Sequence, residues 1–227
     1  MSIQNQYDPN RIHGYNLHHF GDVWAYTNLL LRLSEGSGQP VKVSIENKKI
    51  KNTILQISPF LKSSGTIVFS NRRANFVYNY CDPYIINFLP SIRTWKYKRS
   101  LKSKIVAYQF DGNHLSEYKN LPGNEIQFLI NYLKKMGYTP VNVGGYKKIG
   151  FIVNTLSNCK FFVGCPSGLS VAARSVKCPI NLISWKLSKN DVGYLKYCQC
   201  PTAKFFERTD DFLSFTKTKQ SRLINLL

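Results

Sequence analysis

The sequence predicts an α/β protein whose chain is divided into two halves, each built on a parallel sheet. Three observations support this fold class. Short apolar segments typical of strands alternate with longer segments of helical periodicity. Glycine and proline residues separate these segments. The 227 residues can form one large or two small domains, and a hydrophobic content of 43 % supplies a core.

The first half, residues 1–100, is predicted to open with a polar strand around 11–19 and a helix over 22–33. Apolar side chains recur in that helix at the spacing of one helical face, at Val23, Tyr26, Leu30 and Leu33. Two glycines, Gly36 and Gly38, mark its end. The other elements expected in this half are, in chain order, a strand over 41–45, a helix over 50–61 and a strand over 66–70.

The second half, residues 101–227, shows the alternation of strands and helices more clearly. The helix over 125–136 carries one apolar face and is followed by Gly137, a natural C-terminal cap. Ligands of open α/β sheets bind beyond the carboxyl ends of the strands. The predicted elements of this half are, in chain order, strand 104–110, helix 125–136, strand 141–143, a helix around 149–156, strand 161–164, helix 170–176 and strand 180–184.

The charge is strongly positive and indicates an anionic partner. Lys and Arg number 31 against 12 Asp and Glu, which gives a net charge of +19. Such a field concentrates a nucleotide diphosphate, a phosphorylated glycan, an anionic membrane face or nucleic acid near the surface. In the densest cluster of basic residues, Trp95 and Tyr97 stand between the charged positions. This segment is either a polyanion-binding segment or a solvated connection between the halves. Its basic residues are Arg93, Lys96, Lys98, Arg99, Lys102 and Lys104.

The six cysteines form no CxxC pair, so we expect reduced thiols rather than a disulfide framework. The sequence Cys198-Gln199-Cys200 lacks the spacing of a zinc site, and we expect no metal. The chain has neither an apolar run long enough to cross a bilayer nor a signal peptide. These features predict a cytoplasmic protein without a transmembrane segment.

Three loops at predicted strand ends carry candidate functional residues. The turn at Ser167-Gly168 leads from a strand into a helix. It is either a phosphate-binding turn or a helix N-cap formed by a serine without further function. In the loop over 111–122, Lys119 either neutralises a phosphate or is one of many exposed lysines. Asp22 is either a general base or a helix cap. The neighbours of these residues that could assist them or line the site are His18, His19, Asn113 and Ser116.

The three loops together resemble motifs of the heptosyltransferase family, whose fold is the two-lobed glycosyltransferase B fold. The family's Gly-Asp-Val loop corresponds to Gly21-Asp22-Val23. Its Lys-x-Trp-Pro stretch corresponds to Lys119-Asn120-Leu121-Pro122. Its Gly-x-Asp-(Ser/Thr)-Gly-Leu-Ser-His motif corresponds to the segment 164–171, where Pro166 replaces the Asp and Val171 replaces the His. The resemblance spans about residues 12–185.

The resemblance implies two Rossmann-like lobes that face a cleft, with a first lobe that is shortened here. The lobe over 1–100 would hold the acceptor, and the lobe over 101–227 would hold a nucleotide-sugar donor. Asp22 would be the catalytic base of an inverting, metal-independent transfer. Lys119 would contact the donor phosphate, and backbone groups of Ser167, Gly168, Leu169 and Ser170 would hold the diphosphate.

The acceptor is left open by the sequence. The family precedent predicts a phosphorylated bacterial or viral surface glycan, with peripheral contact to an anionic membrane. An alternative is a viral enzyme that glycosylates a hydroxymethylated base in DNA, for which the cluster over 93–104 would follow the phosphate backbone. The replacements at Pro166 and Val171 also permit a non-catalytic basic binding module.

Overall fold

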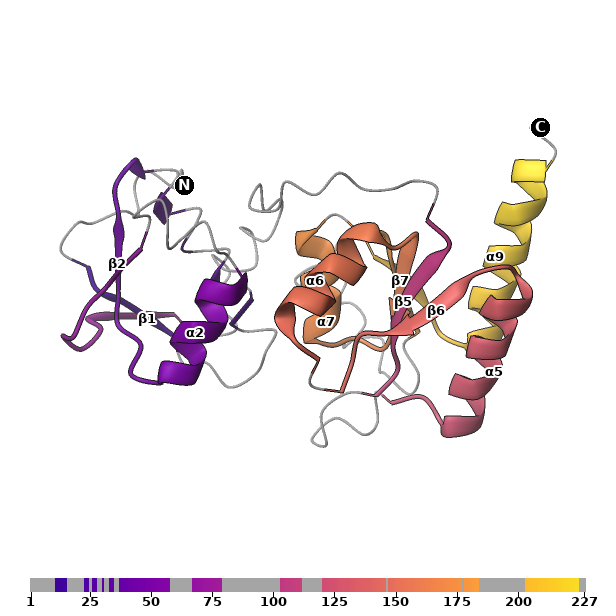
Figure 1. Ribbon diagram of the computed structural model, residues 1–227, viewed down its shortest axis with the longest axis horizontal. Helices are drawn as coiled ribbons and strands as arrows, with labels where there is room; N and C mark the ends of the chain where they lie inside the picture. The colour runs from indigo at the N-terminus through magenta and orange to yellow at the C-terminus, as the bar shows by residue number, and fades with distance from the viewer. Residues whose placement is uncertain are drawn as a thin grey trace. The chain divides into compact units, whose positions relative to one another are not determined.

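The computed structural model shows an α/β chain, which confirms the predicted fold class (Figure 1). The chain forms two compact units, one of Met1–Lys96 with Lys148–Gly150, the other of Tyr97–Lys147 with Phe151–Leu227. Each unit contains one sheet, and every strand pair is parallel. The structure describes residues 11–15, 23–24, 26–27, 30, 33–34, 37–57, 67–78, 103–111, 120–145, 147–176, 178–183 and 203–224.

The N-terminal unit contains a sheet with the strand order β3-β2-β1-β4. Val41, Val43 and Ile67 are buried, as is Ile54 of helix α2. This pattern explains why alternate positions of β2 are apolar: its residues Val41 and Val43 face the core while Lys42 between them is exposed. The elements are β1 (His13–Tyr15), β2 (Val41–Val43), α2 (Lys48–Ile57), β3 (Ile67–Phe69) and β4 (Phe76–Tyr78).

The predicted helix after the first strand is confirmed at the residues that the structure describes. Val23, Tyr26, Leu30 and Leu33 are helical and buried, as their spacing predicts. The buried hydroxyl of Thr27 donates to the carbonyl of Val23 over 2.7 Å. The chain leaves the helix at Gly38, which has a φ of 65° and donates its N–H to Ser34. A positive φ at this place favours glycine.

One strand of this unit, β4, is not predicted from the sequence. Only residues 70–75 connect β3 to β4, and this connection contains no helix. The connection is fixed at both ends by hydrogen bonds. Ser70 N–H donates to Val43 O, and Asn75 exchanges hydrogen bonds with the backbone of Ile12. The alternation of strands and helices fails here, which is why the sequence pattern gave no signal for β4.

The C-terminal unit contains a sheet with the strand order β6-β5-β7-β8-β9. The order reverses direction between β5 and β7, which is the point where open α/β sheets bind ligands. Figure 1 shows α5 and α9 on one face of this sheet and α6 and α7 on the other. The elements are β5 (Ile105–Gln109), α5 (Gly123–Lys135), β6 (Thr139–Asn142), α6 (Ile149–Asn158), β7 (Phe161–Gly164), α7 (Gly168–Ser175), β8 (Ile180–Ile183), β9 (Lys204–Phe206) and α9 (Thr209–Ile224).

Helix α5 has the apolar face that its sequence predicts. Leu129 and Leu133 are buried against the sheet, while Ile126 is partly buried at the margin of the same core. The helix ends at Gly137, whose φ is 79° and whose N–H donates to Lys134 O. The predicted glycine cap is therefore confirmed.

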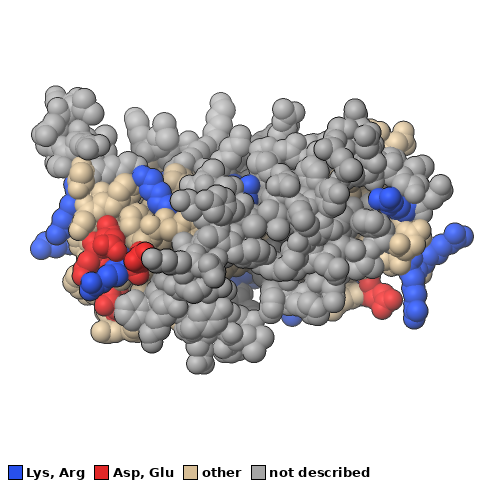
Figure 2. All heavy atoms as spheres, turned by 180° about the vertical axis from the view of Figure 1, so that it is seen from behind, with Lys and Arg blue, Asp and Glu red and all other residues tan. Residues whose placement is uncertain are grey.

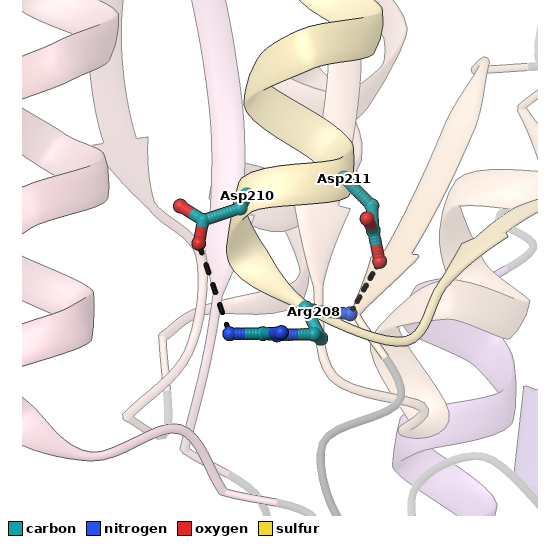
Figure 3. A network of polar contacts seen from close by, with 3 residues as sticks. All are labelled: Arg208, Asp210 and Asp211. Carbon is teal, nitrogen blue, oxygen red and sulfur yellow. Dashed lines mark hydrogen bonds and ion pairs between the residues drawn. The ribbon is translucent and has the colours of Figure 1, made fainter.

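The last two elements, β9 and α9, are not predicted from the sequence. Helix α9 docks beside α5, where Tyr132 Oη lies 3.0 Å from Thr216 Oγ1 and the buried Phe212 fills the core. Its first turn is closed by the carboxylate of Asp211, which accepts the N–H of Arg208 over 3.1 Å (Figure 3). The ion pair of Arg208 with Asp210, also drawn there, is exposed and contributes little to stability.

The cysteines within the described residues are free thiols, as expected. Cys159, Cys165 and Cys178 are buried, and the Sγ atoms of Cys159 and Cys178 lie 3.3 Å apart. Cys81, Cys198 and Cys200 lie outside the described residues. Within the described part of the chain, no helix is long and apolar enough to cross a membrane.

Candidate functional site

The reversal of strand order in the C-terminal sheet brings together the carboxyl ends of β5, β6 and β7. Gln109 ends β5, and the backbone of β7 continues past Gly164 into the turn at Ser167. Asn142, the last residue of β6, and Gly144 after it lie on the other side of Gln109. Polar groups from three separate segments therefore converge at this edge, here called the switch-point edge.

Gly164 allows β5 and β7 to approach each other at the switch-point edge. A Cβ atom built on Gly164 would lie 2.1 Å from the carbonyl oxygen of Gln109, a distance that no side chain permits. The same carbonyl accepts the N–H of Cys165 over 2.9 Å. Glycine is therefore required at this position by the close approach of the two backbones.

The turn after β7 is organised by the cap of α7. Ser167 Oγ accepts the N–H of Leu169 over 3.3 Å, and Ser170 Oγ donates to Ser167 O over 2.6 Å. Ser170 Oγ also accepts the N–H of Ser167 over 3.4 Å, so the two serines form a capping box. Within the described residues, the N–H of Gly168 has no hydrogen-bond partner. This N–H, together with the positive end of the helix dipole, can receive an anionic oxygen.

Gln109 connects β5 to this turn through its side chain. Its Oε1 accepts the hydroxyl proton of Ser167 over 2.5 Å. Its Nε2 donates to the backbone carbonyl of Asp111 over 2.7 Å. Both ends of the carboxamide are therefore engaged, which fixes its orientation.

The opposite side of the switch-point edge is narrow and polar. A Cβ on Gly144 would lie 3.0 Å from Gln109 Cγ and 3.2 Å from the side-chain oxygens of both Asp111 and Asn142. Asn142 Oδ1 accepts the N–H of Gly144 over 2.8 Å. Burial raises the pKa of the Tyr108 phenol above its ordinary value, and the Asp111 carboxylate raises that pKa further. Tyr108 is therefore a neutral hydroxyl at physiological pH.

Four of the sequence-predicted site residues are described, and the structure brings them together in one turn. They are Ser167, Gly168, Leu169 and Ser170. The side chains of Leu169 and Ser170 are buried, so a ligand could reach these two residues only through their backbone. The other predicted site residues lie outside the described residues: Asp22, His18, His19, Asn113, Ser116, Lys119, Arg93, Lys96, Lys98 and Arg99.

Sequence reasoning missed Gln109 and Asn142 as site residues. Each is a polar residue at or near the carboxyl end of a predicted strand, where ligands of α/β sheets bind. This position in the sequence could have identified both residues as candidates for ligand binding. The pairing of Gln109 with Ser167 joins residues 58 positions apart and has no local signature.

The described charges do not form one patch on the face drawn in Figure 2. That view shows Lys and Arg side chains at separate places, with acidic side chains gathered beside some of them toward its left side. In the N-terminal unit, exposed basic side chains lie at the start of α2 and after β3. They are Lys48, Lys49, Arg72 and Arg73, and we call this group the basic edge.

The basic edge lies at the carboxyl ends of β2 and β3. Ser70 N–H donates to Val43 O over 2.8 Å, so the segments that follow the two strands run side by side. Lys51 Nζ lies 4.1 Å from the centre of the Phe69 ring, which places the first turn of α2 over the end of β3. None of the four basic groups has an ion-pair partner within the described residues.

Comparison with known proteins identifies the fold. The chain is similar to the bacterial iron-containing dodecameric glycosyltransferase TibC from enterotoxigenic E. coli H10407, with a TM-score of 0.53 and 16 % identity over 76 % of this chain and 57 % of TibC. It is similar to the heptosyltransferase TibC in complex with ADP-D-beta-D-heptose, with a TM-score of 0.55 and 16 % identity over 88 % and 63 % of the two chains. No protein-family model and no curated protein matches the sequence.

A third similar structure is that of a family 9 glycosyl transferase from Veillonella parvula DSM 2008. It matches with a TM-score of 0.53 and 12 % identity over 93 % of this chain and 92 % of that chain. These similarities confirm the predicted resemblance in fold to glycosyltransferases of the heptosyltransferase and glycosyltransferase B type. The chain spans less than two thirds of the length of either TibC structure.

The iron of TibC has no counterpart that the described residues could hold. Among them there is no group of three or more His, Cys, Asp or Glu side chains placed to bind a metal ion. The expectation of a metal-independent protein remains a prediction.

Proposed function

We propose that this protein is a glycosyltransferase that moves a sugar from a nucleotide-sugar donor to a hydroxyl group of an anionic acceptor. The observation that carries the proposal is the capped turn at Ser167-Gly168, which lies at the strand-order reversal of a glycosyltransferase-like fold. One similar structure, that of TibC, is in complex with ADP-D-beta-D-heptose. A donor of the same chemical class, a sugar linked to a nucleoside diphosphate, suits the turn in this chain.

The donor diphosphate would be held mainly by main-chain groups. The Gly168 N–H, which has no partner among the described residues, and the dipole of α7 favour a negative oxygen without a metal ion. Lys119 would add a positive charge, a role carried over from the Lys-x-Trp-Pro motif of the heptosyltransferases. The carboxamide of Gln109, which accepts the hydroxyl proton of Ser167, carries no charge.

The chemistry we propose is a single displacement. Asp22 takes the proton from the acceptor hydroxyl, and the hydroxyl oxygen forms a bond to the anomeric carbon of the sugar. The bond from that carbon to the diphosphate oxygen breaks on the opposite face, so the configuration inverts. The leaving diphosphate carries away the electron pair, and its charge is met by Gly168 N–H and Lys119.

The basic edge supports an acceptor that carries phosphate groups. Its four cations are exposed, and Glu46 is the only acidic residue in the described segments around them, 44–51 and 70–73. Lysines in the first turn of a helix oppose the helix dipole, and α2 has no acidic residue there to offset them. We propose a phosphorylated glycan as the acceptor, with the N-terminal unit as the unit that binds it.

The proposal is tested by replacing the base. With purified protein and a nucleotide sugar, we expect slow release of nucleoside diphosphate as water replaces the acceptor. Asp22→Asn should reduce this release at least 100-fold while the dissociation constant of the donor stays within twofold of that of the wild type. Release is measured by coupled detection of the nucleotide, and binding by calorimetry.

The matched control is Asp210→Asn, which removes an exposed carboxylate whose ion pair with Arg208 lies on α9. This variant should release nucleotide at the rate of the wild type. Normal turnover by Asp22→Asn would refute the assignment of the base. Absence of release by the wild type with every donor would refute the proposed activity.

A further inference from the structure

The side chain of Gln109 is fixed by hydrogen bonds at both ends of its carboxamide. It bridges from the end of β5 to the turn before α7, two segments that are adjacent in the sheet and distant in sequence. Gly144 lies against its Cγ, with no room for a side chain between them. Because Nε2 donates to Asp111 O, the carboxamide must present Oε1, an acceptor, to Ser167.

This orientation decides what the hydroxyl of Ser167 can do. A serine hydroxyl has one proton, and here Gln109 Oε1 accepts it. A lone pair of the same oxygen accepts the N–H of Leu169. Ser167 therefore has no proton left to donate to a phosphate oxygen. Within the described turn, Gly168 offers the N–H that is without a partner.

We infer that Gln109 is a positioning residue for the donor diphosphate: its carboxamide fixes Ser167 as the cap of α7 and thereby orients the N–H of Gly168 toward the ligand. The inference rests on the proposed function, because it assigns a role within the same donor site. Without the carboxamide, the Ser167 hydroxyl rotates to other acceptors and its cap on Leu169 loosens. The first turn of α7 then loses the fixed geometry on which binding of the diphosphate depends.

A purely structural role for Gln109 makes a different prediction. If the hydrogen bond to Ser167 only joins β5 to α7, its removal lowers stability and leaves the affinity of the folded protein for nucleotides unchanged. Nucleotide affinity, measured well below the midpoint of thermal unfolding, therefore separates the two roles.

The test uses Gln109→Met, which keeps the length of the side chain and removes both hydrogen bonds. Calorimetric titration of the full chain with ADP, UDP and GDP identifies the nucleotide that the wild type binds. For that nucleotide we expect Gln109→Met to raise the dissociation constant at least tenfold. The matched control is Gln127→Met, which removes an exposed amide that donates to Asn131 on α5 and should change nothing.

A double-mutant cycle with Ser167→Ala adds a second readout. Since the two side chains act through one hydrogen bond, Gln109→Met combined with Ser167→Ala should weaken binding no more than the stronger single variant. Gln109→Ala covers the case in which Gln109→Met does not fold. It also removes the acceptor of the Ser167 hydroxyl proton and adds no charge, so binding should again be at least tenfold weaker than in the wild type.

The outcomes separate this inference from the proposed function. If the wild type binds none of the nucleotides, both are refuted. If the wild type binds one, and Gln109→Met or, where that variant does not fold, Gln109→Ala binds it equally well, the inference alone is overturned. Effects of Gln109→Met and Ser167→Ala that multiply in the double variant would also overturn it, because they would show independent roles.

Discussion

At the scale of single residues, the switch-point edge depends on two backbones that touch. Gly164 lies against the carbonyl of Gln109, and that carbonyl accepts the N–H of Cys165. The turn at Ser167 begins three residues later, so the position of Gly164 sets where the turn lies relative to β5. The glycine is therefore part of the site although it contributes no functional group.

For that reason, substitution of Gly164 should lower the free energy of unfolding. We expect Gly164→Ala to lower the free energy of unfolding by about 1–3 kcal/mol, because the methyl group can be placed only if the backbones of β5 and β7 separate. Urea unfolding of the variant measures the loss. Gly123→Ala is the control, since a Cβ on Gly123 meets nothing within 4 Å. It should leave stability unchanged or raise it by up to about 1 kcal/mol. Equal stability of the two variants would contradict the contact.

Of the residues at the site, some could be predicted from the sequence and others could not. The cap residue Ser167 could be predicted, because a serine between a strand and a helix is typical of a helix N-cap. Gln109 has no such signature, since its partner is far away in the chain and its role depends on the side-chain orientation that Asp111 imposes. Long-range polar contacts of this kind require the structure.

At the scale of elements, the predictions succeeded where apolar periodicity was strong. The strand over 161–164 and the helices α5 and α6 are found where the pattern placed them, because their buried faces repeat at the periods of a strand and a helix. Element ends were less accurate. The predicted helix 170–176 begins two residues earlier, at Gly168, because the capping box of Ser167 and Ser170 closes its first turn.

The elements that were missed have weaker patterns. The strands β4 (FVY) and β9 (KFF) show no alternation of apolar and polar residues. Helix α9 is rich in Thr, Ser and Lys, and the buried apolar side chains described in it are Phe212 and Leu213, near its start. Its position comes from the docking of these two residues into the core beside α5, and an apolar face along its whole length is not required.

The docking of α9 gives a test at this scale. We expect Phe212→Ala to lower the free energy of unfolding by about 3–5 kcal/mol, because the ring is fully buried and its edge contacts Phe206 at a centroid distance of 5.4 Å. The matched control is Phe128→Ala on α5, whose ring is 53 % exposed and whose loss should cost less than about 0.5 kcal/mol. Similar urea midpoints for the two variants would show that α9 does not stabilise the unit.

At the scale of the whole molecule, the chain contains two parallel α/β sheets in 227 residues. It covers 57 % and 63 % of the two TibC structures but 92 % of the Veillonella protein. The connection of residues 70–75 joins β3 to β4 without a helix between these strands. The shortened first lobe that the resemblance implies stays a prediction.

The two units carry different charges at the edges that we assign to ligands. The basic edge of the N-terminal unit offers four exposed cations. The described groups around the Ser167 turn are main-chain groups and neutral side chains, and the Asp111 carboxylate lies beside Gly144 on the β6 side of the switch-point edge. This difference suits an acceptor that is bound through charge attraction and a donor that is bound through oriented hydrogen-bond donors. The sequence predicted the excess of positive charge but not that four exposed cations gather after β2 and β3, because that placement depends on the parallel register of those strands.

The central claim is that the C-terminal unit binds a nucleotide sugar, and a thermal-shift titration with UDP-, GDP-, ADP-, CMP- and dTDP-sugars tests it most directly. The account predicts that one of them raises the midpoint of unfolding in a concentration-dependent manner, since a ligand at one hundred times its dissociation constant stabilises the folded state by about 2.7 kcal/mol. The shift should be lost in Lys119→Ala and reduced in Ser167→Ala. No shift with any of the five classes of donor at millimolar concentration would contradict the account and would favour a basic binding module without donor chemistry.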